Sequence, residues 1–159
     1  MNGSVHAFLT REPVLGEIMT SPVVTVGMDD TVGAARELFR EARFHHLPVV
    51  EGGRLVGIVS DRDILRAISP YLSTQSEREQ DAATLRRKIH QIMKHHVVTA
   101  SKGDPIVVGA ALLVDHAISC LPLLSPDGRI EGIVATKDFL RWLVRQPLQP
   151  VAASVVSQD

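Results

Sequence analysis

The sequence predicts an α/β (α+β) protein made of two copies of one β-α-β-β-α unit. The first observation is composition, because 159 residues with 45% hydrophobic and 22% charged side chains are typical of a folded domain. The second is an internal repeat at an offset of 74 to 75 residues, which indicates a duplicated fold. The recurring pairs are Ile18-Met19 and Ile92-Met93, Val23 to Thr25 and Val97 to Thr99, Leu47-Pro48 and Leu121-Pro122, and Gly57 to Val59 and Gly132 to Val134.

The first copy is predicted from apolar spacing and turn residues. Short apolar runs indicate strands, glycine pairs indicate turns, and aspartates ahead of an apolar face indicate helix starts. In order, the elements are a strand over 23–26, a helix capped by Asp29-Asp30, strands over 47–50 and 55–59 around a Gly52-Gly53 turn, and a closing helix that contains Ile64, Leu65 and Ile68 and ends before Pro70.

The second copy follows the same plan with stronger start signals. Asp104 is the expected cap of its first helix, and Pro105 takes the first helical position, where the missing N–H costs nothing. A hairpin is predicted over 121–134 around a Pro-Asp-Gly turn, and a last helix ends before Pro147.

A helical connector is predicted between the copies. Ser76 and Glu79 have the spacing of a capping box, and apolar residues recur behind them at helical spacing. The expected organisation is an arm over 1–13, repeat 1 over 14–69, the connector over 70–90, repeat 2 over 91–146 and a flexible tail over 147–159.

Charge and composition exclude several function classes. The net charge of −1 and only six aromatic residues argue against a nucleic-acid surface. The single cysteine, Cys120, allows no intrachain disulfide and no cysteine-based zinc site. No stretch is apolar enough to cross a membrane, so a cytoplasmic protein is expected.

Both copies resemble the CBS domain, a small regulatory domain named after cystathionine β-synthase. The resemblance rests on Leu-Pro before each hairpin and on Gly-Ile-Val followed by an aspartate after it, and it covers about residues 14–146. It implies a tandem pair, or Bateman module, whose halves pack with pseudo-twofold symmetry and leave two equivalent clefts. In relatives such clefts hold AMP, ADP, ATP or S-adenosylmethionine. The resemblance implies that the chain carries no enzymatic chemistry. It also implies that two modules stack into a flat homodimer.

Asp63 is the leading candidate for binding a ligand. It falls in the first turn of a helix, where the dipole stabilises a carboxylate that can accept from both hydroxyls of a ribose. Ser60 and the exposed N–H groups of the helix start suit a phosphate, and Arg62 can pair with one. The same residues are equally coherent as a simple helix cap.

Two histidines favour this cleft further. His45 and His46 precede Leu47-Pro48, where relatives often place a basic residue near the ligand phosphates, and an imidazole titrates near pH 6.5. The adjacent histidine pairs are not expected to bind metal, because neighbouring strand residues face opposite ways.

The second cleft is expected to bind more weakly. It keeps the carboxylate of Asp138 and the cation of Lys137, but Ala135 replaces the serine and Thr136 comes one residue late.

The resemblance also implies that each cleft borrows residues from the other copy. Lys94 and Val98 are expected in the Asp63 cleft, and Thr20 and Val24 in the Asp138 cleft. Both valines are equally consistent with ordinary core packing.

The sequence therefore favours a regulatory module that binds an adenosine compound and acts in trans on an unidentified protein. The alternatives are a purely structural dimerisation module with vestigial clefts and, less favoured, a small enzyme or metal-binding protein that uses its histidines. No acid–base or nucleophile motif supports an enzyme, and Cys120 is expected to be a small buried hydrophobe.

Overall fold

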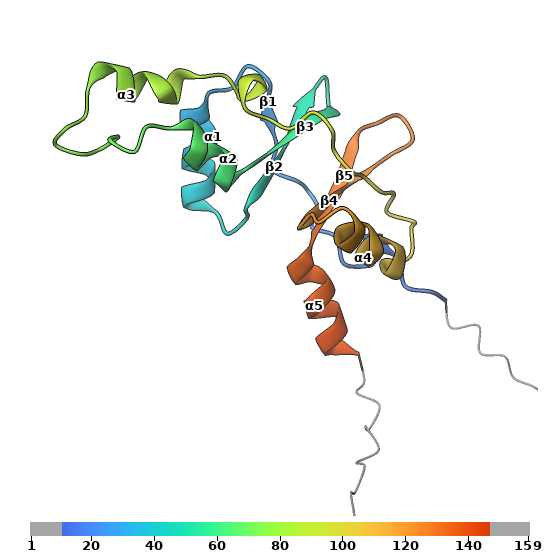
Figure 1. Cartoon of the computed structure of the whole chain (residues 1–159). Coiled ribbons are helices and arrows are strands. Elements are labelled where there is room, and N and C mark those ends of the chain that lie inside the picture. The colour runs from blue at the N-terminus through green and yellow to red at the C-terminus, as the bar shows by residue number, and fades with distance from the viewer. Residues whose placement is uncertain (1–10, 147–159) are drawn as a thin grey trace, which may run out of the picture.

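The computed structural model describes residues 11–146, which form two small bodies joined by a connector (Figure 1). Each body has its own apolar core of aliphatic residues from one hairpin and two helices. The first body contains β1 (Val26–Gly27), α1 (Val32–Glu41), β2 (His46–Glu51), β3 (Arg54–Ser60) and α2 (Asp61–Ala67). The second contains α4 (Ile106–Asp115), β4 (Cys120–Leu124), β5 (Ile130–Ala135) and α5 (Thr136–Arg145).

The two sheets differ at their first strand. In the first body β1 pairs parallel to β2, and β2 pairs antiparallel to β3. In the second body only β4 and β5 pair as strands, and a single parallel bridge from Ala100 to Leu123 stands in place of the first strand. Ala100 occupies the position of Val26, and alanine favours extended pairing less than valine does. The second copy is therefore a reduced version of the predicted unit.

The segment ahead of repeat 1 packs on repeat 2. The 3-10 turn η1 (Leu15–Glu17) places Leu15 in the second core, where its side chain is fully buried. The N–H of Leu15 donates to the carbonyl of Asp104 at 2.9 Å, and the N–H of Ile106 donates to the carbonyl of Pro13 at 2.9 Å. The start of repeat 1 is thus anchored at the first turn of α4.

The segment ahead of repeat 2 packs on repeat 1 in the same way. The turn η3 (Ile89–Gln91) places Ile89 in the first core. Its N–H donates to the carbonyl of Asp30 at 2.9 Å, and the N–H of Val32 donates to the carbonyl of Arg87 at 2.8 Å. These contacts are the repeat-related counterparts of the previous set, so the copies exchange their leading segments about a pseudo-twofold axis.

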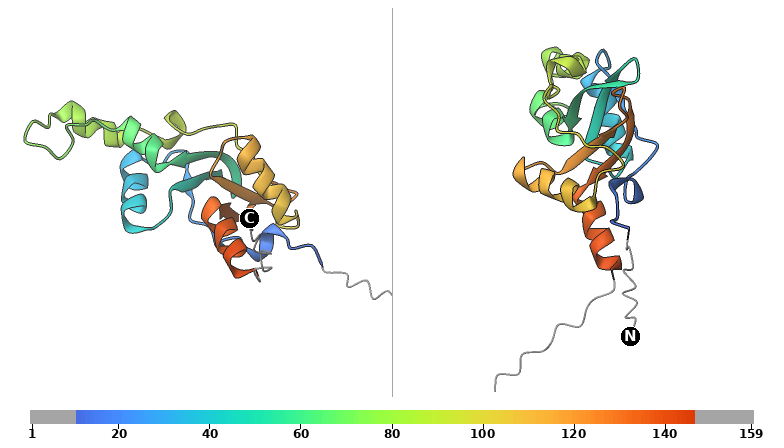
Figure 2. Two further views of the ribbon diagram at one scale, coloured as in Figure 1. Left: turned by 60° about the horizontal axis from the view of Figure 1, so that its bottom comes forward. Right: turned by 90° about the vertical axis from the view of Figure 1, so that its right-hand side faces the viewer.

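The two hairpins lie side by side along this axis (Figure 2). Their turns touch, because the N–H of Leu55 donates to the carbonyl of Gly128 at 3.1 Å and Arg54 bridges to Arg129. At the other end His46 approaches Ser119, with 3.4 Å between Nε2 and Oγ. The expected packing of the halves about a pseudo-twofold axis is therefore found.

Two predicted helix caps are wrong. The helix α1 is capped by Thr31, whose Oγ1 accepts from the N–H of Ala34 at 3.1 Å, and α4 begins at Ile106 with Pro105 at the cap position. Asp30 and Asp104 instead accept from backbone N–H groups three residues earlier, at 2.7 and 2.8 Å. Each aspartate closes the turn that leads into the helix rather than the helix itself.

The connector is less helical than its spacing predicts. Only α3 (Glu79–Ala83) and the 3-10 turn η2 (Thr84–Arg86) are helical between α2 and η3. The predicted box of Ser76 and Glu79 is wrong, because Asp81 caps α3 by accepting from the N–H of Arg78 at 2.8 Å. The connector projects from the first body away from the second (Figures 1 and 2). The part of the predicted arm before residue 11 and the predicted tail over 147–159 lie outside the described residues.

Candidate functional site

Asp63 stands at the start of α2, directly after β3. Its Oδ2 accepts two hydrogen bonds from Ser60, from the N–H at 2.9 Å and from Oγ at 2.6 Å. The N–H of Asp63 in turn donates to Oγ of Ser60 at 3.3 Å, which completes a capping box. Oδ1 accepts no hydrogen bond from any residue in the range 11–146, so one carboxylate oxygen is available to a ligand hydroxyl.

The backbone at the start of α2 does not offer the expected free N–H groups. The N–H of Asp61 donates to the carbonyl of His45 at 3.1 Å, and the N–H of Arg62 donates to Oδ1 of Asp61 at 2.8 Å. Those of Ser60 and Asp63 are taken by the capping box. A phosphate at this cleft would therefore need side-chain cations, because the backbone donors already have partners.

The two histidines have different surroundings. His45 is exposed, and its Nδ1 lies 2.7 Å from Oδ2 of Asp61. His46 faces the second repeat, and burial lowers its pKa from 6.5, an effect opposed by the carboxylate of Asp61 and reinforced by His45. His46 is therefore neutral at pH 7, which removes one of the cations expected from the sequence.

Lys94 lies where the resemblance implied, beside β3. Its N–H donates to the carbonyl of Ile58 at 2.9 Å, and the N–H of Ile58 donates back at 3.0 Å. Its charge also acts on His46, as does that of Asp63. The exchanged segment thus brings a cation of repeat 2 to the Asp63 cleft.

The repeat-related contact brings Thr20 to β5. The N–H of Thr20 donates to the carbonyl of Ile133 at 2.9 Å and receives the reciprocal bond at 3.1 Å. Val98 packs partly buried against the second core, whereas Val24 is 47% exposed. The structure thus brings Thr20 to β5, the strand that precedes Asp138. Val98 makes core contacts, as its alternative interpretation as an ordinary core residue predicts.

The Asp138 carboxylate is fully engaged, unlike that of Asp63. Oδ2 accepts from the N–H of Ala135 at 2.9 Å, and Oδ1 pairs with Arg141 at 3.2 Å. Thr136 turns its Oγ1 to the carbonyl of Ser119 at 3.3 Å. Lys137 is exposed on the first turn of α5. A ribose at this cleft would have to displace an ion pair.

A hollow of about 220 Å³ lies beside Asp63. Besides the carboxylate it is lined by Arg66 and Ala67 of α2, by Arg87 before η3, and by Ile92. Neither arginine was a candidate in the sequence, although the match of Arg66 to Arg141 in the repeat was visible there. Arg87 offered no local signal, because only the exchange of segments brings it to α2.

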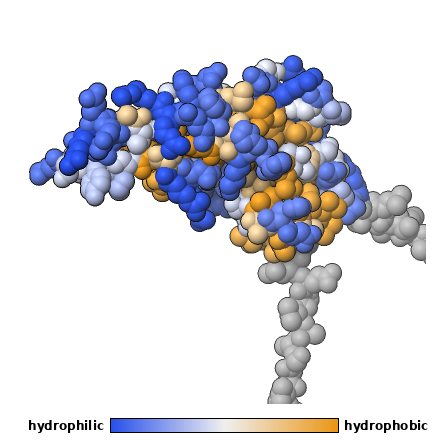
Figure 3. Space-filling view, turned by 45° about the horizontal axis from the view of Figure 1, so that its top comes forward, coloured by the Kyte–Doolittle hydropathy of each residue, from blue (hydrophilic) through white to orange (hydrophobic). Residues whose placement is uncertain are grey.

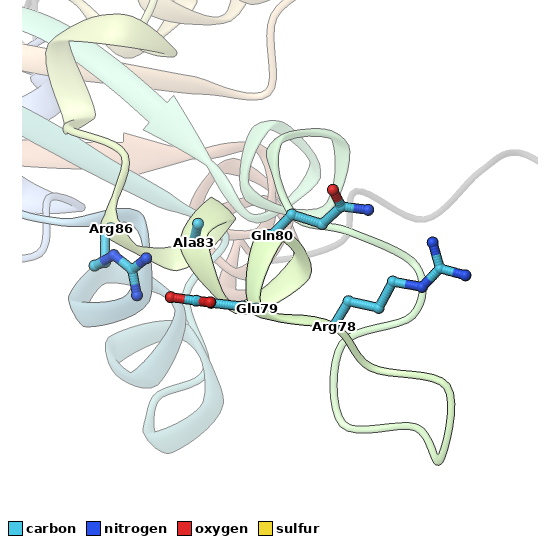
Figure 4. A pocket seen from close by; sticks show the side chains of 5 residues that line it. All are labelled: Arg78, Glu79, Gln80, Ala83 and Arg86. Atoms are coloured by element: carbon cyan, nitrogen blue, oxygen red, sulfur yellow. The ribbon is translucent and has the colours of Figure 1, made fainter.

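A second hollow lies on the connector and does not belong to this site. Its volume is about 490 Å³, and it is lined by Arg78 and by side chains of α3 and η2. Figure 4 shows Glu79 and Arg86 pointing toward each other while Arg78 points away. None of the candidate ligand-binding residues lines it.

Other chemistry finds little support within residues 11–146. This part of the chain holds no group of three or more histidine, cysteine, aspartate or glutamate side chains placed to bind a metal ion. Burial raises the pKa of Cys120 to about 12, so its thiol is not an activated nucleophile. No helix in the described range has the length and apolar character needed to span a membrane.

Comparison with known proteins identifies the class. The model of the CBS domain matches residues 15–70 and 89–145, so the chain belongs to the CBS-domain family as a tandem pair. A CBS domain-containing protein of Dictyostelium discoideum is 34% identical over 137 residues, which are 85% of this chain and 93% of that protein. Homoserine O-acetyltransferase of Methanococcoides burtonii is also 34% identical, but this chain spans only 26% of its length, so the likeness covers its CBS region.

Two solved structures carry ligands. The CBS domain pair of protein MJ0100, in complex with 5′-methylthioadenosine and S-adenosyl-L-methionine, matches with a TM-score of 0.69 and 25% identity over 84% of this chain and 97% of that one. The structure of CBSX2 in complex with AMP has the same TM-score and identity, over 82% of this chain and 96% of that chain.

Proposed function

We propose that this CBS pair is a regulatory module that binds an adenosine compound at the Asp63 cleft. The observation that carries the proposal is the unengaged Oδ1 of Asp63, a residue that lines the hollow between α2 and the exchanged segment. A carboxylate oxygen held rigid by its capping box is a preorganised acceptor for a ribose hydroxyl. The ligands of two similar structures, S-adenosyl-L-methionine with 5′-methylthioadenosine in one and AMP in the other, support the adenosine class.

The two clefts are proposed to be unequal. The Asp63 cleft combines a free carboxylate oxygen with Lys94, whereas at Asp138 both oxygens have partners and Thr20 takes the place of the lysine. The Asp138 cleft, with Lys137 and Thr136 on its helix, is therefore the weaker one. Binding at the stronger cleft would then act in trans on a regulated protein.

Calorimetric titration with adenosine, AMP, ADP, ATP and S-adenosylmethionine tests this function. Asp63→Asn is the informative variant, because its amide oxygen can keep both bonds from Ser60 while the NH₂ group replaces the free acceptor. A hydrogen bond to a charged group is worth about 1.5–3 kcal/mol, so affinity should fall by about tenfold to a hundredfold with the melting temperature unchanged.

Asp138→Asn is the matched control and should leave the stronger binding event intact. If Asp63→Asn binds like the parent chain, the site assignment is wrong. If the parent chain binds none of these compounds, the interpretation as a purely structural dimerisation module replaces the interpretation as a ligand sensor.

We also propose that the chain forms a homodimer through its second body. The sequence predicts that the closing helices expose apolar side chains for association, namely Ile64, Ile68, Phe139 and Leu143. This prediction is wrong for Ile64, which is buried in the first core. Exposed apolar side chains instead gather on α4 and α5, and Figure 3 shows hydrophobic surface over the second repeat. These are Val107, Val108, Val114, Leu140, Leu143 and Val144.

A further inference from the structure

The hollow beside Asp63 contains more positive charge than an adenosine ribose requires. Two of its five lining residues are arginines, Arg66 on α2 and Arg87 ahead of η3, and Asp63 is its one carboxylate. Within residues 11–146 no ion pair joins Asp63 to either guanidinium: Oδ2 of Asp63 accepts from Ser60, and Arg87 donates to the carbonyl of Ala67. This excess charge suits an anion that extends beyond the ribose.

The two arginines are held differently. Arg87 donates from Nη1 to the carbonyl of Ala67 at 3.2 Å, which fixes its guanidinium at the end of α2, and its other N–H groups have no partner among residues 11–146. Arg66 forms no ion pair and no side-chain hydrogen bond with other residues of the described chain. One arginine is thus preorganised, and the other can close on a ligand.

The second repeat lacks this pair. Arg141, the counterpart of Arg66, is committed to Asp138 at 3.2 Å. Pro13 takes the place of Arg87, as the equivalent bonds from Val32 to Arg87 and from Ile106 to Pro13 show. The repeat therefore supplies an internal comparison in which the fold is kept and both free guanidinium groups are absent.

From this asymmetry we infer that the Asp63 cleft selects a nucleoside polyphosphate, a di- or triphosphate, and that Arg66 and Arg87 bind its terminal phosphates. The inference rests on the proposed function for the adenosine moiety. Guanidinium groups pair with phosphate oxygens in a bidentate manner, and two of them can clamp a chain of two or three phosphates. An adenosine compound without phosphates would leave both arginines in water.

The test compares adenosine, AMP, ADP and ATP on the whole chain and on Arg66→Ala and Arg87→Ala. The affinity of the parent chain should rise from adenosine to ADP and ATP, and each substitution should weaken ATP by about tenfold while adenosine stays unchanged. Arg86→Ala is the matched control, because Arg86 is adjacent in sequence but lines the other hollow. Arg87→Ala also loses its bond to Ala67, so a thermal melt accompanies it, and Arg66→Ala carries the test if that variant unfolds.

Tripolyphosphate alone separates this inference from the proposed function. If it binds the parent chain and the arginine variants weaken it, the clamp is supported even where adenosine makes no contribution. Equal affinity for adenosine and ATP would overturn the clamp and leave the adenosine site standing. Equal losses in Arg86→Ala and Arg66→Ala would also overturn it, because the effect would then be general charge. Absence of binding by every nucleotide and by tripolyphosphate would overturn both.

Discussion

The exchange of leading segments predicts a coupling between two residues 94 positions apart. Leu15 is fully buried in the second core, against α4. Truncating a buried leucine costs about 2–5 kcal/mol, a large part of the roughly 5–15 kcal/mol that stabilises an average domain. Leu15→Ala should therefore lower the urea midpoint strongly.

A substitution at Gly109 of α4 tests whether the side chain of Leu15 packs against this helix. A Cβ added at Gly109 would lie 2.5 Å from Cδ2, 3.0 Å from Cδ1 and 3.2 Å from Cγ of Leu15. Gly109→Ala alone should therefore destabilise by about 1–3 kcal/mol through overpacking, less up to about 1 kcal/mol of gained helix propensity. In the Leu15→Ala background all three atoms are gone, so the same change should stabilise by up to about 1 kcal/mol.

The assay is a double-mutant cycle by urea unfolding, read by the fluorescence of the single tryptophan, Trp142, which packs against the second core. Hydrogen exchange adds the location: Leu15→Ala should speed exchange in β4 and β5, and the mirror variant Ile89→Ala should speed it in α1 and β2. A cost of Gly109→Ala that is equal in both backgrounds, or faster exchange in α1 upon Leu15→Ala, would refute the exchanged packing.

Three further outcomes are expected. Because burial lowers the pKa of His46 in the folded chain, the unfolded chain binds more protons than the folded chain below pH 6.5. The contribution of His46 to stability should therefore be full above pH 6.5, fall as the pH drops toward the lowered pKa and then level off. His46→Gln should remove this step from an acid titration of stability. With a pKa of about 12 and 6% exposure, Cys120 should resist a thiol reagent at pH 8 and react at once in urea; rapid labelling of the native chain would contradict its burial. In sedimentation velocity the parent chain should be a dimer and Val144→Asp should shift it toward monomer, whereas the connector control Tyr71→Asp should not; a monomeric parent chain would remove the dimer proposal.

The sequence by itself determined the elements that rest on local periodicity. The repeat predicted two related units, and the hairpins were predicted correctly because alternating apolar residues and glycine turns are local signals. Asp63 and Ser60 could be singled out because they share one strand–helix junction. Their capping bonds also follow from a spacing of three residues.

Tertiary structure decided which copy each leading segment serves. Leu15 and Ile89 are apolar residues that each precede one of two similar copies. No local pattern therefore indicates that each packs in the core of the other copy. That choice is made by non-local packing, whose free energy depends on partners far away in sequence. It brings Lys94 and Arg87 to the Asp63 cleft.

The errors in the helix caps have the same origin. Whether Asp30 or Thr31 caps α1 depends on backbone angles at the turn, and there the carboxylate finds the N–H of Gly27 instead. The charge state of His46 likewise depends on its burial against the second body, which its sequence position beside Leu47-Pro48 does not encode.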